Sequence, residues 1–194
     1  MMVKICGITN REDALAAIEA GASALGFNFY TESPRFVAPE LAADLGSGLP
    51  TIKVGIFVNE SPASVSRTMQ IAGIDIAQVY GGEEYKGLRT WRACRVKSGD
   101  FALPDDNNSE AYLLDGFSAD AYGGSGKTFA WSIARKLPKK IILAGGLDAS
   151  NVREAIEQAR PWGVDACSRI EKSPGRKDHE KMKRFIAAAH ANNL

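Results

Sequence analysis

The stretch MMVKICGITNREDA (residues 1–14) contains the signal that decides the fold. Its apolar run ends on the thiol of Cys6, and Gly7 interrupts the run. Thr9, followed three residues later by Glu12, matches the capping box that begins many helices. A short strand followed at once by a helix is the repeating unit of α/β folds. We therefore ask whether this unit recurs along the chain.

Eight short runs rich in apolar and β-branched residues do recur, starting roughly 17 to 30 residues apart, the period of a strand-plus-helix unit. Most are continuously apolar, as is typical of parallel strands covered on both faces. The pattern predicts a compact (β/α)8 TIM barrel that forms a single domain over residues 1–194. The predicted strands are Met2–Cys6, Ala24–Phe29, Ile52–Val58, Ile74–Val79, Arg92–Arg95, Ala111–Asp115, Lys140–Ala144 and Val164–Ser168.

Helix signals occupy most of the segments between these strands. Pro39 and Pro62 suit first helical positions, Ser61 suits an N-cap, and further helices are predicted near residues 151–160 and 178–191. By contrast, VKSGDFALPDDNNSE (residues 96–110) has no apolar period, so one or two crossovers should be shortened. A doubly wound open sheet is the alternative fold, but it more commonly has five or six strands.

The composition excludes several classes of protein. The chain has 194 residues, is 45% hydrophobic and 24% charged, and has a formal net charge of +1, so no overall field favours nucleic acid or an anionic membrane. No apolar stretch approaches the roughly 18 residues that span a bilayer, and no secretory signal is evident. Three widely separated cysteines indicate a reducing, cytoplasmic location without disulfides or a zinc site. We expect no metal and no cofactor.

Chemically capable residues follow several of the predicted strands. In a (β/α)8 barrel the active site lies at the carboxyl ends of the strands. Taken singly, each residue has an ordinary explanation, because a cysteine in a strand is most often a small buried hydrophobe and an arginine is usually solvated. Their shared position at one rim of the barrel is the stronger evidence. They are Cys6, Arg35, Asp115, Gly145, Gly146, Ser168 and Arg169.

Two glycine-rich segments suggest contacts with an anion. Gly145 and Gly146 have no Cβ, so their backbone can approach a ligand closely, and the loops after strands seven and eight are the usual phosphate site of this fold. GGSGKT (residues 123–128) lacks the spacing of a Walker loop, which argues against a nucleoside triphosphate site. This segment can still fold over a bound ligand.

Seven motifs together resemble the phosphoribosylanthranilate isomerase family of tryptophan biosynthesis. The match runs in order over nearly the whole chain, and the combination of the first motif with ILAGGL is the most specific part. The motifs are KICGIT (4–9), ALGFNFY with SPR (24–35), VGIFVN (54–59), LLD (113–115), GGSGKTFAW (123–131), ILAGGL (142–147) and SPGRKD (173–178).

The resemblance implies a cofactor-independent Amadori rearrangement of N-(5-phosphoribosyl)anthranilate, an aminoaldose, to a 1-deoxyribulose 5-phosphate. It implies that Cys6 is the general base, that Asp115 is the general acid and that Arg35 holds the anthranilate carboxylate. It assigns phosphate binding to Gly145, Gly146 and Ser168, and also to Gly124 and Gly126. The only expected partner is this small substrate, and the protein is expected to be a monomer or a homodimer.

This chemistry sets expectations for two pKa values. Asp115 must be protonated when substrate binds, so its pKa should be raised by burial or by nearby phosphate charge. Cys6 must act as a thiolate, so its pKa should be lowered. Lys4 precedes Cys6 by two residues and should share its strand face, which makes it a candidate source of the positive charge.

The chain departs from the family pattern at several positions. Tyr80 replaces a histidine, so it should act by hydrogen bonding without titrating near neutrality. Arg169 replaces a glycine at the phosphate site, where its side chain either binds phosphate or blocks the site. Ala38 replaces a helix cap, and Ala130 changes the FDW motif to FAW. Alternatives are an indole-glycerol-phosphate synthase, a histidine-pathway isomerase, or a non-catalytic phosphate-binding barrel.

Overall fold

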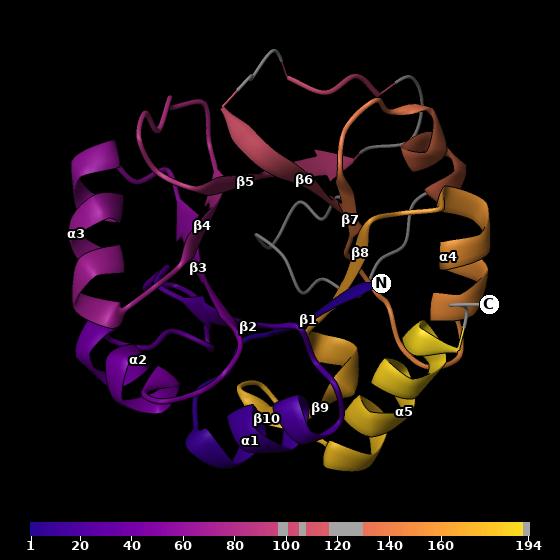
Figure 1. The fold of residues 1–194 in the computed structure, drawn as a ribbon, viewed down its shortest axis with the longest axis horizontal. Helices are drawn as coiled ribbons and strands as arrows, with labels where there is room; N and C mark the ends of the chain where they lie inside the picture. Colours follow the sequence, from indigo (N-terminus) through magenta and orange to yellow (C-terminus); the bar gives the residue numbers. More distant parts are fainter. Residues whose placement is uncertain (97–100, 105–107, 117–129, 192–194) are drawn as a thin grey trace.

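The computed structural model describes residues 1–96, 101–104, 108–116 and 130–191. Eight parallel strands, β1 to β8, pair in chain order, and β8 pairs with β1 to close a barrel. Figure 1 shows helices α1 to α5 arranged outside this ring of strands. The predicted (β/α)8 barrel is confirmed, and the open-sheet alternative is wrong because its edge strands would remain unpaired.

The strands of the barrel follow the predicted apolar runs, with shifted ends. They are β1 (Met2–Cys6), β2 (Ala24–Asn28), β3 (Ile52–Val58), β4 (Ile76–Tyr80), β5 (Thr90–Val96), β6 (Ser109–Gly116), β7 (Ile141–Leu143) and β8 (Gly163–Ala166). The helices are α1 (Arg11–Glu19), α2 (Pro39–Gly46), α3 (Pro62–Ala72), α4 (Val152–Ala159) and α5 (His179–His190).

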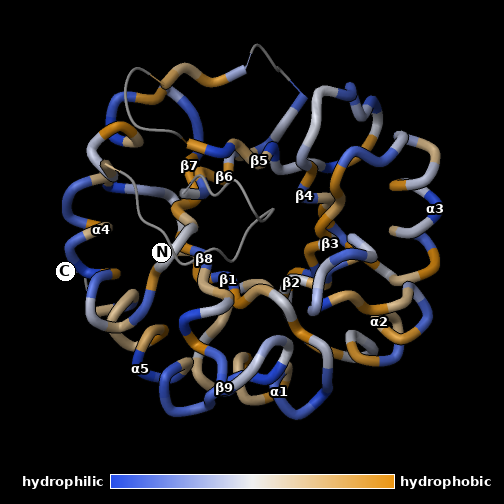
Figure 2. The backbone as a smooth tube through the Cα atoms, turned by 180° about the vertical axis from the view of Figure 1, so that it is seen from behind, coloured by the Kyte–Doolittle hydropathy of each residue, from blue (hydrophilic) through white to orange (hydrophobic). Residues whose placement is uncertain are grey.

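The barrel strands are buried on both faces, which explains their continuously apolar sequences. Side chains pointing inward form an inner core that includes Val54, Ile76 and Leu113. Side chains pointing outward form a second core beneath the helices, which includes Val3 and Ile5 of β1. Figure 2 shows the resulting hydrophobic colour along β3, β4 and β7. None of the helices within the described ranges is long and apolar enough to cross a membrane.

The helix ends follow local sequence signals, with one correction. Pro39 and Pro62 stand in the first helical positions, and Ser61 Oγ accepts a hydrogen bond from the backbone of Ser64, as predicted. Helix α1 is capped by Asn10, whose Oδ1 accepts from the N–H of Asp13 at 2.9 Å. The predicted capping box with Thr9 is therefore wrong, because the Thr9 hydroxyl instead donates to the carbonyl of Gly175.

The described residues of the crossovers on either side of β6 form no α-helix, in line with the predicted shortening. Residues 101–104, which follow β5, are not helical, and between β6 and β7 the described residues form only the 3-10 helix η1 (Trp131–Lys136). After β8, a second 3-10 turn, η2 (Ser168–Ile170), leads into a small hairpin of β9 (Glu171–Ser173) and β10 (Arg176–Lys177). No apolar pattern marks this hairpin in the sequence, so it was not predicted, and its residues Glu171 and Lys177 contact Arg35 and the carbonyl of Cys167 at the barrel rim.

Candidate active site

One cavity of about 390 Å³ lies at the carboxyl ends of the strands. This volume falls in the usual range for pockets that bind small molecules. The cavity is lined by seven of the nine predicted site residues, namely Cys6, Arg35, Asp115, Gly145, Gly146, Ser168 and Arg169. The other two, Gly124 and Gly126, lie outside the described residues. The structure therefore brings together the residues predicted to hold both ends of a substrate.

The glycine after Cys6 is required by its neighbours. Gly7 has a φ of +76°, in the left-handed region that favours glycine. A Cβ at this position would lie 2.6 Å from Cδ of Arg35 and 3.0 Å from Sγ of Cys167. Gly7 therefore allows β1 to end on a thiol while an arginine and a second thiol approach the same turn.

Cys6 does not titrate alone, because the thiol of Cys167 lies close enough to interact with it. This interaction raises the pKa of Cys6, as burial also does, and it lowers the pKa of Cys167 to about 7. Lys177 and Arg35 lower the pKa of Cys167 further. The expectation of a lowered pKa at Cys6 is therefore wrong, and the first negative charge of the pair is held by Cys167. Sequence reasoning missed this residue by treating it as a buried hydrophobe.

Lys4 does lie on the same strand face as Cys6, but its main partner is a carboxylate from β8. Its Nζ donates to Oδ1 of Asp165 at 2.9 Å, and the Lys4 side chain is completely buried. Burial lowers the pKa of Lys4, but Asp165 and Cys6 outweigh that effect and the net direction is upward. Lys4 is therefore a positive charge next to the thiol pair, in a buried ion pair with Asp165, whose own pKa burial raises to about 7 although Lys4 opposes the rise.

Asp115 lies in a buried environment that favours its protonated form, as a general acid requires. It is only 2% exposed, and burial, followed by the neighbouring charge of Asp165, raises its pKa from 3.8 to about 7. The Tyr80 hydroxyl donates to Asp115 Oδ2 at 3.4 Å, and burial keeps the pKa of Tyr80 well above its usual value. Among the described residues, Asp115 Oδ1 has no hydrogen-bond partner. The predictions of a raised pKa at Asp115 and of a non-titrating Tyr80 are confirmed.

Arg35 is held by a carboxylate from the hairpin that follows β8. Its Nε donates to Glu171 Oε1 at 3.0 Å and its Nη2 donates to Oε2 at 2.7 Å, so the pair is bidentate. Lys177 Nζ contacts the same carboxylate at 2.7 Å. Burial raises the pKa of Glu171, but Arg35 and Lys177 outweigh this effect and hold it below its usual value. Arg35 is thus oriented, rather than solvated, and its Nη1 takes no part in this pair.

Another part of the cavity lining comes from the loops after β7 and β8. Gly145 and Gly146 both have positive φ values, 84° and 69°, and the amide of Asn151 donates to the carbonyl of Gly146 at 2.8 Å. Arg169 Nη1 lies 3.1 Å from Asp148 Oδ2, so an ion pair bridges the two loops. The Arg169 side chain is 46% exposed, which places its charge at the mouth of the cavity.

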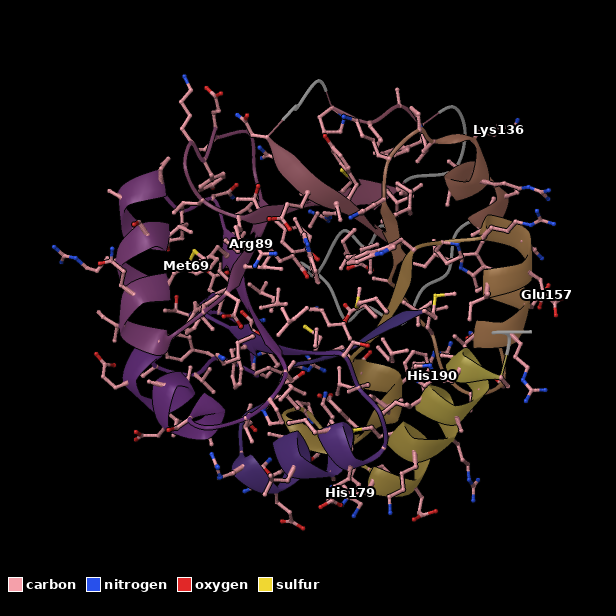
Figure 3. The ribbon with its side chains drawn as sticks, viewed as in Figure 1. Met69, Arg89, Lys136, Glu157, His179 and His190 are labelled. Carbon is pink, nitrogen blue, oxygen red and sulfur yellow. The ribbon has the colours of Figure 1, made fainter. Side chains whose placement is uncertain are left out.

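Neither of the two histidines of the chain lines the cavity. Both belong to α5, where His179 pairs with Asp13 of α1 at 2.8 Å and His190 contacts the carbonyl of Gly21 at 3.1 Å (Figure 3). Within the described part of the chain, no cluster of three or more histidine, cysteine or acidic residues is arranged to hold a metal ion. Among the described residues, the acid–base groups that line the site and can titrate near neutral pH are therefore carboxyl and thiol groups, with the phenol of Tyr80 beside them.

Comparisons with known proteins agree with this geometry. Residues 3–188 match the family model described as N-(5'-phosphoribosyl)anthranilate isomerase. The isomerase of Solibacter usitatus is 54% identical over 98% of both chains, and that of Geobacter sp. strain M21 is 48% identical, covering 96% of this chain and 97% of its own.

Solved structures show the same similarity. The isomerase from Thermus thermophilus superimposes with a TM-score of 0.88 at 35% identity, over 98% of this chain and 99% of its own. A second isomerase structure, in complex with reduced 1-(o-carboxyphenylamino)-1-deoxyribulose 5-phosphate, has a TM-score of 0.82 at 33% identity over the same shares. The chain belongs to the N-(5'-phosphoribosyl)anthranilate isomerase family.

Proposed function

We propose that this protein isomerises N-(5'-phosphoribosyl)anthranilate to the corresponding 1-deoxyribulose 5-phosphate in tryptophan biosynthesis. The observation that carries the proposal is one cavity lined by an acid with a raised pKa, Asp115, a thiol, Cys6, and a positioned arginine, Arg35. These are the groups that an Amadori rearrangement of an anthranilate sugar needs.

In the first step, protonated Asp115 donates its proton to the furanose ring oxygen. The C1′–O bond breaks, and the nitrogen lone pair forms a protonated Schiff base. A carboxyl group with a pKa of about 7 can deliver this proton near neutral pH, whereas an ordinary aspartate is ionised there. Asp115 Oδ1, which has no hydrogen-bond partner within the described part of the chain, can form one with the substrate.

In the second step, the thiol pair removes the C2′ proton. The pair holds one negative charge near neutrality, and movement of the Cys6 proton to Cys167 leaves Cys6 as the thiolate. The iminium group acidifies the C2′ proton, which Cys6 then accepts. The resulting enolamine tautomerises to the ketone.

The two ends of the substrate are held by different elements. We assign the anthranilate carboxylate to Arg35, with Glu171 as the residue that fixes the orientation of its guanidinium group. We assign the phosphate to the loops that contain Gly145, Gly146 and Ser168, with Arg169 supplying positive charge at the mouth. The assigned roles of Gly124 and Gly126, a monomeric or homodimeric state and a cytoplasmic location remain predictions.

The non-catalytic alternative gains no support from the substitutions that suggested it. Tyr80 hydrogen-bonds to Asp115, and Arg169 forms an ion pair with Asp148 at the rim of the cavity. The related synthase and the histidine-pathway isomerase are not favoured, because the relatives described above are all phosphoribosylanthranilate isomerases.

A steady-state assay tests the proposal. Phosphoribosylanthranilate is generated enzymatically, and its disappearance is followed by loss of its fluorescence. The wild type should turn it over, and Cys6→Ala should lower kcat by about 10²–10⁴-fold with little change in KM. Folded wild-type protein that neither turns over the substrate nor supports growth of a tryptophan auxotroph lacking the isomerase would refute the proposal.

A further inference from the structure

The thiols of Cys6 and Cys167 lie side by side where the barrel closes. Strands β1 and β8 are parallel neighbours, and their last paired residues are Ile5 and Ala166. Cys6 is the last residue of β1 and Cys167 directly follows β8, so the two cysteines are the next residues after this last pair, at the same end of neighbouring strands. Neighbouring strands lie about 4.8 Å apart, which is within the range of about 4.4–6.8 Å between Cα atoms that a disulfide requires. The placement of the two cysteines is therefore compatible with a disulfide.

Side-chain contacts support the same conclusion. The two thiols are close enough for each to shift the pKa of the other, and Cys167 Sγ lies 3.0 Å from the position of a Cβ built on Gly7, the residue after Cys6. Both cysteines line the cavity, so a small solute that enters it meets both sulfur atoms. Cys94, by contrast, is buried in the outer core and does not line the cavity.

The charges around the pair favour reaction with an oxidant. The interaction with Cys6, with the charges of Lys177 and Arg35, lowers the pKa of Cys167 to about 7, so a large fraction of it is thiolate at neutral pH. Thiolates, not thiols, attack peroxides and disulfides. A reactive thiolate beside a second thiol is the arrangement found in redox-sensitive sites.

We propose that Cys6 and Cys167 form a reversible intramolecular disulfide on exposure to a peroxide, and that this bond switches the enzyme off. The Cys167 thiolate attacks one oxygen of hydrogen peroxide, the O–O bond breaks, and a sulfenic acid and hydroxide form. The Cys6 sulfur then attacks the sulfenic sulfur, the S–O bond breaks, and the second hydroxide leaves. Protons from solvent and the Cys6 thiol complete two waters, so two thiols lose two electrons and one peroxide gains them.

The functional consequence rests on the proposed role of Cys6 as general base. A Cys6 sulfur bonded to Cys167 has no lone pair basic enough to accept the C2′ proton. A dithiol reductant attacks the disulfide, passes through a mixed disulfide and restores both thiols, so the loss of activity is reversible.

The experiment measures the disulfide and the activity separately. Reduced full-length protein is treated with hydrogen peroxide in the absence of substrate, and free thiols are counted after denaturation. The count should fall from three to one. Tryptic digestion should yield residues 5–11 joined to residues 154–169, with a mass lower than the sum of the two peptides by two hydrogens. Activity should fall by about 10²-fold or more and return on treatment with dithiothreitol.

Two variants serve as controls. Cys94→Ala should form the same linked peptide and lose activity reversibly, leaving no free thiol. Cys167→Ala should give no linked peptide. A wild type that keeps three thiols under these conditions, or a link that involves Cys94, would overturn the disulfide.

The outcomes also separate this proposal from the proposed function. A complete Cys6–Cys167 disulfide with unchanged turnover would overturn the switch and the role of Cys6 as base together. Loss of activity in Cys6→Ala without any disulfide in the wild type would leave the isomerase mechanism intact and overturn the redox proposal alone.

Discussion

Replacing Asp115 by asparagine should raise the free energy of unfolding of the protein, although it removes the catalytic acid. The carboxyl group of Asp115 is 2% exposed, and its pKa in the folded protein is about 7, compared with a reference value of 3.8. Each pH unit of difference corresponds to 1.36 kcal/mol. Ionised Asp115 therefore destabilises the folded state by up to about 4 kcal/mol, a penalty that asparagine, which is nearly the same size, does not carry.

The raised pKa of Asp115 determines the direction of the stability difference between wild type and variant, and the pH range over which this difference changes. Below about pH 4 the carboxyl is protonated in both the folded and the unfolded state, so it contributes no pH dependence. Between about pH 4 and 7 only the unfolded state ionises, so the stability of the wild type falls relative to the variant. Above about pH 7 both states are ionised and the difference becomes constant.

Urea denaturation of wild type and Asp115→Asn at a series of pH values measures this difference. The free energy of unfolding of the variant should exceed that of the wild type by an amount that grows from pH 4 to 7, while kcat falls by about 10²–10⁴-fold. Asp148→Asn is the matched control. Burial raises the pKa of Asp148, but hydrogen bonds from Ser150 and Arg169 outweigh it and lower the pKa below 3.8. Asp148 is then largely ionised in both states from pH 4 to 7, so this variant should be less stable than wild type by an amount that stays nearly constant over that range. If the difference in the free energy of unfolding between wild type and Asp115→Asn is constant from pH 4 to 9, the reasoning is refuted.

Four further outcomes are expected. The profile of kcat/KM against pH should be bell-shaped with a maximum near 7, because the thiol pair must have lost one proton and Asp115 must keep its own. Cys167→Ala should move the acidic limb upward by about one to two pH units, since the interaction between the two thiols that stabilises the first charge is lost; an unmoved limb contradicts a shared charge. Glu171→Gln should raise KM more than it lowers kcat, because Arg35 loses its charged bidentate partner, and equal losses would mean a different role. Gly7→Ala should lose both activity and thermal stability, because its Cβ would meet Arg35 at 2.6 Å in a left-handed backbone; a melting temperature within experimental error of wild type would count against this account.

Much of the fold could be predicted from the sequence because its signals are local. Continuous apolar runs mark strands that are buried on both faces, and prolines and caps mark helix starts. The strand ends were less predictable, because they depend on neighbours: Thr90 and Val96, outside the predicted run, belong to β5 because each pairs with a residue of β6. The predicted strand Val164–Ser168 ends earlier, at Ala166, where the backbone turns into η2.

The site was predicted less completely, because its electrostatics come from distant parts of the chain. Lys4 was recognised because it lies two residues from Cys6, but Asp165, which pairs with it, is 161 residues away. Likewise Glu171, the partner of Arg35, is 136 residues away and lies in a short polar hairpin without an apolar pattern. The motifs thus indicated which groups line the cavity, but they did not indicate which of the two thiols, Cys6 or Cys167, loses its proton first.

The barrel closes where β1 pairs with β8, and the active site needs residues from both strands. Catalytic activity therefore requires the complete barrel. The sulfur pair and the Lys4–Asp165 ion pair each join the first strand of the chain to the last part of the ring. A nascent chain therefore has no functioning base until nearly all of it has been synthesised, however well its early helices have formed. Fragments that end before β8 should have no activity alone. Mixing such a fragment with a peptide that contains β8 should restore activity only in the fraction of molecules in which β8 pairs with β1.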